Sequence, residues 1–224
     1  MNIASFIDHT VLKPTTTISD VKILCNEAIE YGFAAVCIPP PLVKNAKAFL
    51  KGTEIKTATV IGFPFGYSNA KAKIFETQQA IEDGADEMDV VINLIALRGK
   101  AWTYLESEIK YIVEAVHKNR SLIKVIIESG ILTNEEIVQC CEIYAKAGVD
   151  FVKTSTGYAE KGASLEAVQL MRQTLPSSIR IKASGGIRNY GFAKQLIGAG
   201  ADRLGCSASV AIMNEQFKQT NEGL

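Results

Sequence analysis

Gly84-Ala85-Asp86 leads directly into the apolar run Glu87-Met88-Asp89-Val90-Val91-Ile92, at the end of a segment with helical spacing. The chain repeats this order of helix, glycine and short apolar strand at Gly32, Gly148 and Gly200. Glycine just past a helix accepts the left-handed conformation that closes the last helical turn. These junctions therefore predict a chain in which helices and strands alternate.

The other apolar runs extend this alternation to eight strands, each followed by a helix. We expect strands at 5–8, 34–38, 56–61, 87–92, 123–127, 151–154, 180–183 and 203–206. We expect helices at 19–31, 41–51, 70–83, 102–119, 134–147, 164–175, 190–199 and from about 207. This pattern is typical of an α/β fold, the (β/α)8 TIM barrel. A doubly wound open sheet is the alternative, but it would normally have a Gly-rich loop after the first strand, where this chain has Asp8-His9-Thr10.

Composition indicates a single domain, residues 1–224, and limits its partners. Of the 224 residues 47% are hydrophobic, enough for one large core. Lys and Arg together number 24, as do Asp and Glu, so no net basic field attracts nucleic acid or an anionic membrane. No segment approaches the ~20 apolar residues of a membrane span. The N-terminus lacks the basic start and long apolar run of a signal peptide, so we expect a cytoplasmic protein.

The cysteines and histidines argue against a disulfide framework and a metal site. The five cysteines contain no Cys-x-x-Cys pair, which indicates reduced thiols. His9 and His117, the two histidines of the chain, are too few for the usual His-rich catalytic metal site. We therefore expect no metal.

Two lysines stand at the C-terminal ends of expected strands, Lys153 in 151–154 and Lys182 in 180–183. Burying an isolated ammonium group costs several kcal/mol or more. A buried lysine therefore tends to lose its proton, and a neutral amine attacks carbonyl groups. Neighbouring strands lie about 4.8 Å apart, so the two amines can come close and disfavour double protonation. The pair predicts an enzyme that forms a Schiff base.

The alternation of side chains along a barrel strand adds two inward residues to this pair. If Lys153 and Lys182 point inward, Asp89 and Lys124 do so on their own strands. A single buried carboxylate or strand-end lysine, such as Lys56, is more often structural than functional. Asp89, Lys153 and Lys182 together, at one face of a barrel, predict an active site.

Two glycine-rich turns follow the seventh and eighth expected strands, at 184–188 and 205–209. Glycines let backbone N–H groups approach an anion, and the helix expected from about 207 points its positive end at the same place. Many barrel enzymes bind a substrate phosphate there. The turns predict a phosphate site, with Arg188 as an additional donor.

These residues resemble the deoxyribose-phosphate aldolases, a class I aldolase family, over nearly the whole chain. The matching blocks are Asp8-His9-Thr10, Leu12-Lys13, Val36-Cys37-Ile38-Pro39, Ile61-Gly62-Phe63-Pro64-Phe65-Gly66, residues 85–93, residues 124–128, Val152-Lys153-Thr154-Ser155-Thr156-Gly157 and residues 182–188. The resemblance implies reversible cleavage of 2-deoxy-D-ribose 5-phosphate into D-glyceraldehyde 3-phosphate and acetaldehyde. It implies no metal or organic cofactor, and it suggests a homodimer.

The resemblance also implies a role for each matching residue. Lys153 forms the Schiff base. Lys182 keeps the free Lys153 amine neutral and helps to move protons, and Asp89 relays protons through a water. The supporting residues are Asp8, which orients the lysines, Thr156, which contacts substrate, Lys124 and Cys37. The phosphate cradle is formed by Gly157, Gly185, Gly186, Gly205 and Ser207. The sequence departs from the family pattern at Tyr158, at Ala208 and in the tail 221–224, which has no terminal tyrosine.

Two other functions compete with the aldolase hypothesis. Cys37, assisted by His9, could act as a thiol nucleophile, although a cysteine on a buried strand is ordinarily a small core residue. A barrel that binds sugar phosphates without catalysis is the second alternative, and the intact lysine pair argues against it.

Overall fold

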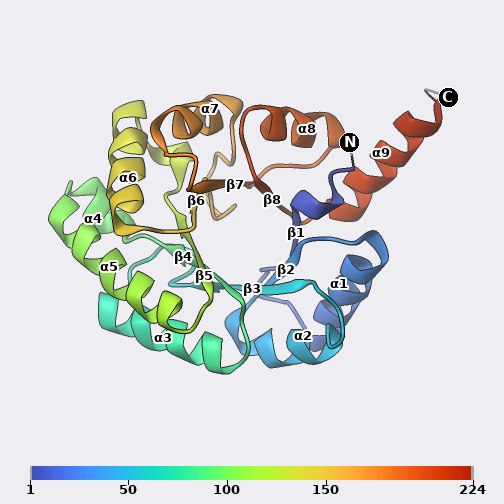
Figure 1. The fold of residues 1–224 in the computed structure, drawn as a ribbon, viewed down its shortest axis with the longest axis horizontal. Helices are drawn as coiled ribbons and strands as arrows, with labels where there is room; N and C mark the ends of the chain where they lie inside the picture. The colour runs from blue at the N-terminus through green and yellow to red at the C-terminus, as the bar shows by residue number, and fades with distance from the viewer. Residues whose placement is uncertain (1, 223–224) are drawn as a thin grey trace.

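Parallel strands close into a barrel with the helices outside it (Figure 1). The computed structural model describes residues 2–222, and within them the barrel has eight strands. They are β1 (Ile7–Thr10), β2 (Ala35–Ile38), β3 (Lys56–Ile61), β4 (Glu87–Val91), β5 (Leu122–Ile126), β6 (Phe151–Lys153), β7 (Arg180–Ser184) and β8 (Arg203–Cys206). Each strand pairs with the next, and β8 returns to β1 through Ile7 and Leu204. The (β/α)8 barrel is confirmed and the open sheet is excluded.

The helices surround this barrel in the order of the sequence. They are α1 (Ile18–Tyr31), α2 (Val43–Phe49), α3 (Ala70–Glu82), α4 (Leu94–Arg98), α5 (Trp102–Lys118), α6 (Asn134–Ala147), α7 (Leu165–Thr174), α8 (Tyr190–Gly198) and α9 (Ser209–Glu222). Single 3-10 turns lie at Ala4–Phe6, Pro40–Leu42 and Ser129–Ile131. The expected boundaries agree to within about two residues.

Two differences from the expected elements have local causes. The first strand begins at Ile7, because Ala4–Phe6 forms a 3-10 turn in which the Phe6 N–H donates to Ile3 O. The short helix α4 was not expected. The side chain of Asn93 caps it by accepting from the Ala96 N–H at 3.0 Å.

Each Gly-x-Asp junction links the end of a helix to the barrel through hydrogen bonds of its aspartate. Gly148 adopts the left-handed conformation at φ 75°, as the pattern predicts. The aspartate that follows accepts a hydrogen bond from the first residues of the preceding strand. Asp86 binds the Thr57 N–H, Asp150 the Ile123 N–H and Asp202 the Ile181 N–H, at 2.8, 2.9 and 2.8 Å. The repeated motif therefore holds adjacent strands in register at the N-terminal end of the barrel.

The strands separate two interiors with different chemistry. Their outward side chains, such as Met88, Val152 and Ile181, belong to the large apolar core between barrel and helices. Inside the barrel, Cys37, Ala58 and Val60 form a small apolar cluster. The buried inward positions also include acidic and basic side chains, described below.

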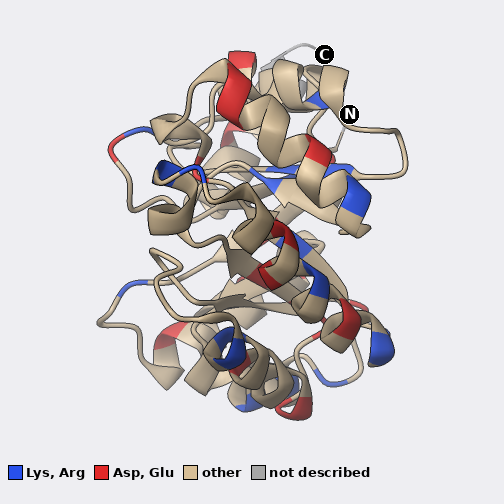
Figure 2. Cartoon of the chain, turned by 90° about the vertical axis from the view of Figure 1, so that its left-hand side faces the viewer, with Lys and Arg blue, Asp and Glu red and all other residues tan. Residues whose placement is uncertain are grey.

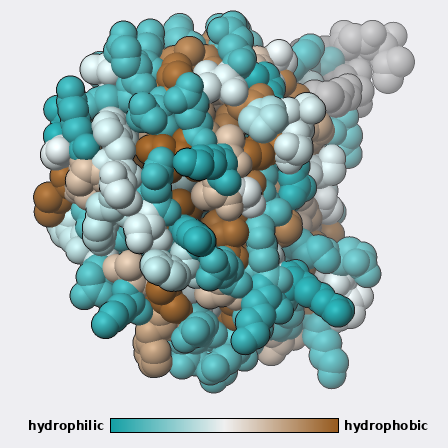
Figure 3. Space-filling view, turned by 60° about the vertical axis from the view of Figure 1, so that its left-hand side comes forward, coloured by the Kyte–Doolittle hydropathy of each residue, from teal (hydrophilic) through white to brown (hydrophobic). Residues whose placement is uncertain are grey.

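Charged residues of both signs are interspersed over the outer helices seen in Figure 2. On the face shown in Figure 3, hydrophobic residues are scattered among hydrophilic ones. No helix in residues 2–222 is long and apolar enough to cross a membrane.

Candidate active site

Lys153 and Lys182 occupy paired positions on β6 and β7 and share one acceptor. Their Nζ atoms each lie 2.7 Å from Asp89 Oδ2 on β4. Lys153 is 3% exposed, and the other two side chains are fully buried. The structure thus brings together the three residues that the strand alternation places on one face.

This trio belongs to a larger group of buried charges, which we call the barrel ion cluster. Lys124 Nζ lies 2.8 Å from Asp89 Oδ1 and 2.5 Å from Glu87 Oε2. Asp8 accepts from Lys182 and from Arg203. Within the described residues the cluster has four basic and three acidic members, listed here: Lys124, Lys153, Lys182, Arg203, Asp8, Glu87 and Asp89. It therefore carries one more basic group than carboxylates.

Lys153 is the basic group that most readily loses its proton. Burial lowers its pKa below the ordinary value of 10.5; Asp89 opposes this effect and Lys182 adds to it. Burial would also lower the pKa of Lys182, but contacts with Asp8 and Asp89 outweigh burial and raise it. A neutral Lys153 also removes the surplus positive charge of the cluster, which a low-dielectric interior favours.

The carboxylates of Asp89 and Asp8 remain ionised. Burial would raise the pKa of Asp89, but Lys124, Lys153 and Lys182 together hold it well below its usual value. The pKa of Asp8 is lowered likewise, against burial, by Lys182 and Arg203. Asp89 is thus a charged acceptor beside the nucleophilic candidate.

A cavity of about 670 Å³ opens above Lys153 at the C-terminal ends of the strands. Of the barrel ion cluster, as far as the structure describes it, Lys153 alone lines this cavity. The volume is in the range of small-molecule sites. Lys153 is therefore the cluster member that a ligand reaches first.

The residues expected to bind phosphate converge on the same cavity. Its lining includes Gly157, Gly185, Gly186, Arg188, Gly205 and Ser207. Gly157 and Gly185 have φ values of 87° and 88°, which favour glycine. A Cβ on Gly205 would lie 2.8 Å from the Ser184 Cβ and 3.1 Å from the Lys182 Cε, so a larger residue does not fit. α9 begins at Ser209, directing the positive end of its dipole at this wall.

Cys37 and His9 do not form a nucleophile–base pair. Cys37 is fully buried inside the barrel, with Sγ 3.9 Å from Asp89 Oδ2, and burial raises the pKa of its thiol. His9 instead places Nε2 2.7 Å from Glu27 Oε2 and packs its ring edge against Phe33. The thiol hypothesis therefore lacks its base.

Two of the positions that depart from the family pattern, Tyr158 and Ala208, lie at the mouth of the cavity and next to its lining residue Ser207. Tyr158 lines the cavity, donates its hydroxyl to Leu12 O at 2.8 Å and packs against Phe63. Ala208 is half-buried against the outer core. The missing terminal tyrosine concerns the end of the chain, where residues 223–224 lie outside the described range.

Sequence reasoning missed three charged residues near the site, of which Glu87 and Glu128 are buried and Arg203 is partly buried. Glu87 stands two residues before Asp89 and Arg203 two before Gly205, so the same period of two could have found them. Glu128 follows β5, is 2% exposed and has a pKa that burial raises. Glu128 lies outside a strand, so the period of two does not point to it or to its contact with Thr156, which is described below.

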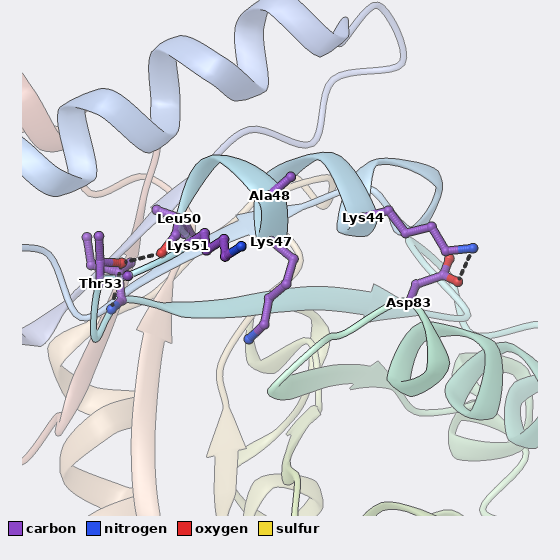
Figure 4. Close-up of a pocket in the computed structure, with 9 residues that line it drawn as sticks. Lys44, Lys47, Ala48, Leu50, Lys51, Thr53 and Asp83 are labelled. Atoms are coloured by element: carbon purple, nitrogen blue, oxygen red, sulfur yellow. Dashed lines mark hydrogen bonds and ion pairs between the residues drawn. The ribbon is translucent and has the colours of Figure 1, made fainter.

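A second cavity lies at the opposite, N-terminal end of the barrel, beside α2 and the loop that follows it (Figure 4). Its lysines face solvent, and Lys44 pairs with Asp83 at 3.0 Å. Lys47 pairs with Asp86 at 2.7 Å. Active sites of this fold lie at the other end, so we assign no chemistry to this cavity.

Comparisons with known proteins identify the family model and the relatives that this chain matches. The model of the DeoC/LacD family aldolases matches residues 3–212. The chain is 50% identical over 215 residues to a deoxyribose-phosphate aldolase of Caldicellulosiruptor saccharolyticus, covering 95% of this chain and 97% of that protein. It is 49% identical over 213 residues to the deoxyribose-phosphate aldolase of Thermococcus kodakarensis, covering 94% and 95%. The tetrameric deoxyribose phosphate aldolase from Aeropyrum pernix has the same fold, with a TM-score of 0.89 at 34% identity, covering 96% and 91%.

Proposed function

The chain belongs to the DeoC/LacD aldolase family, and from this premise we propose that it cleaves 2-deoxy-D-ribose 5-phosphate to D-glyceraldehyde 3-phosphate and acetaldehyde through a Schiff base on Lys153. It is an aldolase, a lyase that breaks a carbon–carbon bond. The observation that carries the assignment is that Lys153 both lines the cavity and has a lowered pKa.

In the proposed first step, the neutral Lys153 amine attacks the C1 aldehyde carbon of the open-chain sugar. The carbinolamine that forms takes up a proton on its hydroxyl, loses water and becomes a positively charged iminium. Burial and the positive charge of the neighbouring Lys182 both lower the pKa of Lys153, which favours the neutral amine. The iminium then carries the positive charge that a protonated Lys153 would have carried, and Asp89 at 2.7 Å from Nζ stabilises it.

In the second step, the C2–C3 bond breaks and its electron pair moves to the iminium, giving an enamine. The C3 hydroxyl loses its proton as D-glyceraldehyde 3-phosphate forms. A proton added to C2 restores an iminium, which water hydrolyses to acetaldehyde and the free lysine. Asp89 is ionised and touches both lysines, so we assign the proton relay to it, through a water, with Lys182 as its partner.

The substrate phosphate is assigned to the wall formed by the turns after β7 and β8. Glycines 185, 186 and 205 leave backbone N–H groups accessible there, and Ser207 and Arg188 add polar donors. We expect no metal or organic cofactor. Activity that survives exhaustive EDTA treatment would support this expectation.

Borohydride reduction in the presence of acetaldehyde tests the assignment. The native chain should gain the mass of one ethyl group on the peptide that contains Lys153, and a Lys153→Met variant should gain none. An adduct on another lysine would identify that lysine, and not Lys153, as the nucleophile. If no adduct forms, a sugar-phosphate-binding barrel without catalysis becomes the better hypothesis.

We further propose a cytoplasmic homodimer. The five cysteines are free and buried, as expected of a reducing compartment. The relative from Aeropyrum pernix is a tetramer, which supports self-association. Sedimentation equilibrium of the purified chain measures the oligomeric state, and a monomer at micromolar concentration would contradict the dimer.

A further inference from the structure

Glu128 follows β5 in a backbone conformation that glutamate rarely adopts, with φ 55° and ψ 54°. In this left-handed region the Cβ of an L-residue crowds the following carbonyl oxygen, so the conformation is strained. Such strain persists only where surrounding contacts hold it, and it clusters at functional sites. Here the Ser129 N–H donates to Thr154 O at 2.7 Å, which ties the turn to the end of β6.

The side chain of Glu128 is directed at one residue, Thr156. Its Oε2 accepts from the Thr156 hydroxyl at 2.5 Å and from the Thr156 N–H at 3.2 Å. Oε1 lies 3.3 Å from the same N–H. Glu128 does not line the cavity, whereas Thr156 does. The hydrogen bonds of Glu128 therefore reach the cavity lining through Thr156, while its charge also acts through space on Lys153, whose own charge opposes the rise that burial causes in the pKa of Glu128.

These contacts fix what the Thr156 hydroxyl can offer to a ligand. A hydroxyl has one donor and two acceptor lone pairs. Its donor points to Glu128, and one lone pair accepts from the Tyr158 N–H at 3.0 Å. One lone pair remains, so the Thr156 hydroxyl can accept from a ligand but cannot donate to it. Its partner must be a donor, such as a sugar hydroxyl.

The loop that carries Thr156 is also packed closely against the turns on either side of it. A Cβ on Gly130, two residues after Glu128, would lie 2.3 Å from Lys161 O. A Cβ on Gly162 would lie 2.3 Å from Gly185 O, in the phosphate turn. The turn after β5 therefore supports the loop after β6, which in turn supports the wall assigned to phosphate.

We propose that Glu128 is a positioning residue that orients the Thr156 hydroxyl to accept a hydrogen bond from a hydroxyl of the bound sugar phosphate. This inference rests on the proposed aldolase function. The strained backbone places the carboxylate, and the carboxylate sets the direction of the Thr156 hydroxyl before the substrate enters. Acetaldehyde has no hydroxyl, so its addition to Lys153 should not need this arrangement.

The test compares two variants on two substrates. Glu128→Gly removes the acceptor and relieves the backbone strain, because glycine adopts the left-handed region readily. Glu128→Gln keeps an oxygen that can accept from Thr156. We expect Glu128→Gly to lower kcat/KM for 2-deoxyribose 5-phosphate roughly tenfold, chiefly through a higher KM, as for the loss of one hydrogen bond. Glu128→Gln should stay within about threefold of the native value.

The rate at which the acetaldehyde adduct forms, measured by borohydride trapping, distinguishes a positioning role of Glu128 from a role in folding. It should be equal in the two variants and within about threefold of native, because acetaldehyde has no hydroxyl to donate to Thr156 and both variants remove the same charge, which acts on Lys153 through space. An equal loss on both substrates would mean that Glu128 only maintains the fold, and no loss on the sugar phosphate would remove its role. Failure of Glu128→Gln to retain activity would also overturn the proposal. A native chain that forms no adduct would instead contradict the proposed function itself.

Thr156→Val provides a second, independent arm, since it removes the hydroxyl and keeps the shape of the side chain. In the double variant Glu128→Gly/Thr156→Val, the loss in kcat/KM should be no larger than in Thr156→Val. Additive losses would show that Glu128 does not act through this hydroxyl.

Discussion

Lys153 and Lys182 are paired residues on adjacent strands, yet their surroundings move their pKa values in opposite directions. Both lysines are buried, and burial disfavours the charged form of each. The difference lies in their partners. Lys153 contacts one carboxylate, Asp89, whereas Lys182 contacts Asp89 and Asp8. The pair therefore divides into a nucleophile and a lysine that is protonated in the resting site.

The lowered pKa of Lys153 predicts the pH dependence of Schiff-base formation. The amine reacts when neutral, so the rate of adduct formation should fall as the pH drops below the pKa of Lys153. Because this pKa is depressed, the rate should reach its plateau well before pH 10.5, the ordinary value. The measurement is the trapping rate with acetaldehyde between about pH 5 and 11, with butylamine as the reference amine. A midpoint equal to that of butylamine would contradict the depression.

Phosphate recognition predicts a preference between two sugars. A charge-assisted phosphate cradle supplies several kcal/mol, so 2-deoxyribose 5-phosphate should be cleaved with a kcat/KM roughly two to three decades above that of 2-deoxyribose. Steady-state rates on both sugars measure the ratio. Arg188→Gln should reduce it, because Arg188 lines the same wall. Equal kcat/KM for the two sugars would remove the phosphate assignment.

Much of the site follows from the period of two along the strands. Once the barrel is inferred, Asp89, Lys124, Lys153 and Lys182 must share the inward face, and the structure brings them within hydrogen-bonding distance. The opposite pKa shifts of the two lysines do not follow, because they depend on which carboxylate, Asp8 or Asp89, each amine reaches in three dimensions.

The backbone conformation of Glu128 and the start of the first strand could not be predicted from the sequence. The strained φ of Glu128 is invisible in the sequence, since glycine is the usual mark of the left-handed region and glutamate is not. The expected start of the first strand, at residue 5, was two residues early, because the largely apolar run from Ile3 to Ile7 does not itself show where strand pairing begins. Pairing decides it: Ile7 is the first residue of that run with a partner, Leu204, on β8.

A buried ion pair outside the barrel predicts a stability effect. Lys73 on α3 is fully buried; its Nζ lies 3.0 Å from Glu108 Oε2 on α5 and donates to Val91 O at 2.7 Å. Lys73→Met leaves Glu108 buried without its cation, so the free energy of unfolding should fall by roughly 3–5 kcal/mol. The double variant Lys73→Met/Glu108→Leu should recover most of this loss. Urea denaturation measures both, and equal losses would show that the unpaired charge is not the cause.

Variants of Lys182 test why the site needs two lysines. Lys182→Met removes the positive charge that helps to depress the pKa of Lys153, so that pKa should rise toward its ordinary value. Lys182→Arg keeps a positive charge at this position, but arginine is not deprotonated in proteins and cannot exchange protons with Asp89. The two variants therefore separate an electrostatic role from proton transfer.

We expect both Lys182 variants to be slow at every pH, because Lys182 and Lys153 share Asp89 Oδ2 at 2.7 Å and this contact offers a direct route for a proton. If Lys182 acted through charge alone, Lys182→Arg would remain near the native rate and Lys182→Met would recover as the pH rises through the higher pKa of Lys153. The pH–rate profiles of both variants between about pH 6 and 10 distinguish the two cases, since a depressed lysine returns to its ordinary value over that span. Thermal unfolding of each variant is the control, because Gly205 lies close to the Lys182 side chain and leaves little room for a guanidinium group. A folded Lys182→Arg variant with near-native kcat would leave Lys182 an electrostatic role and assign the proton relay to Asp89 alone.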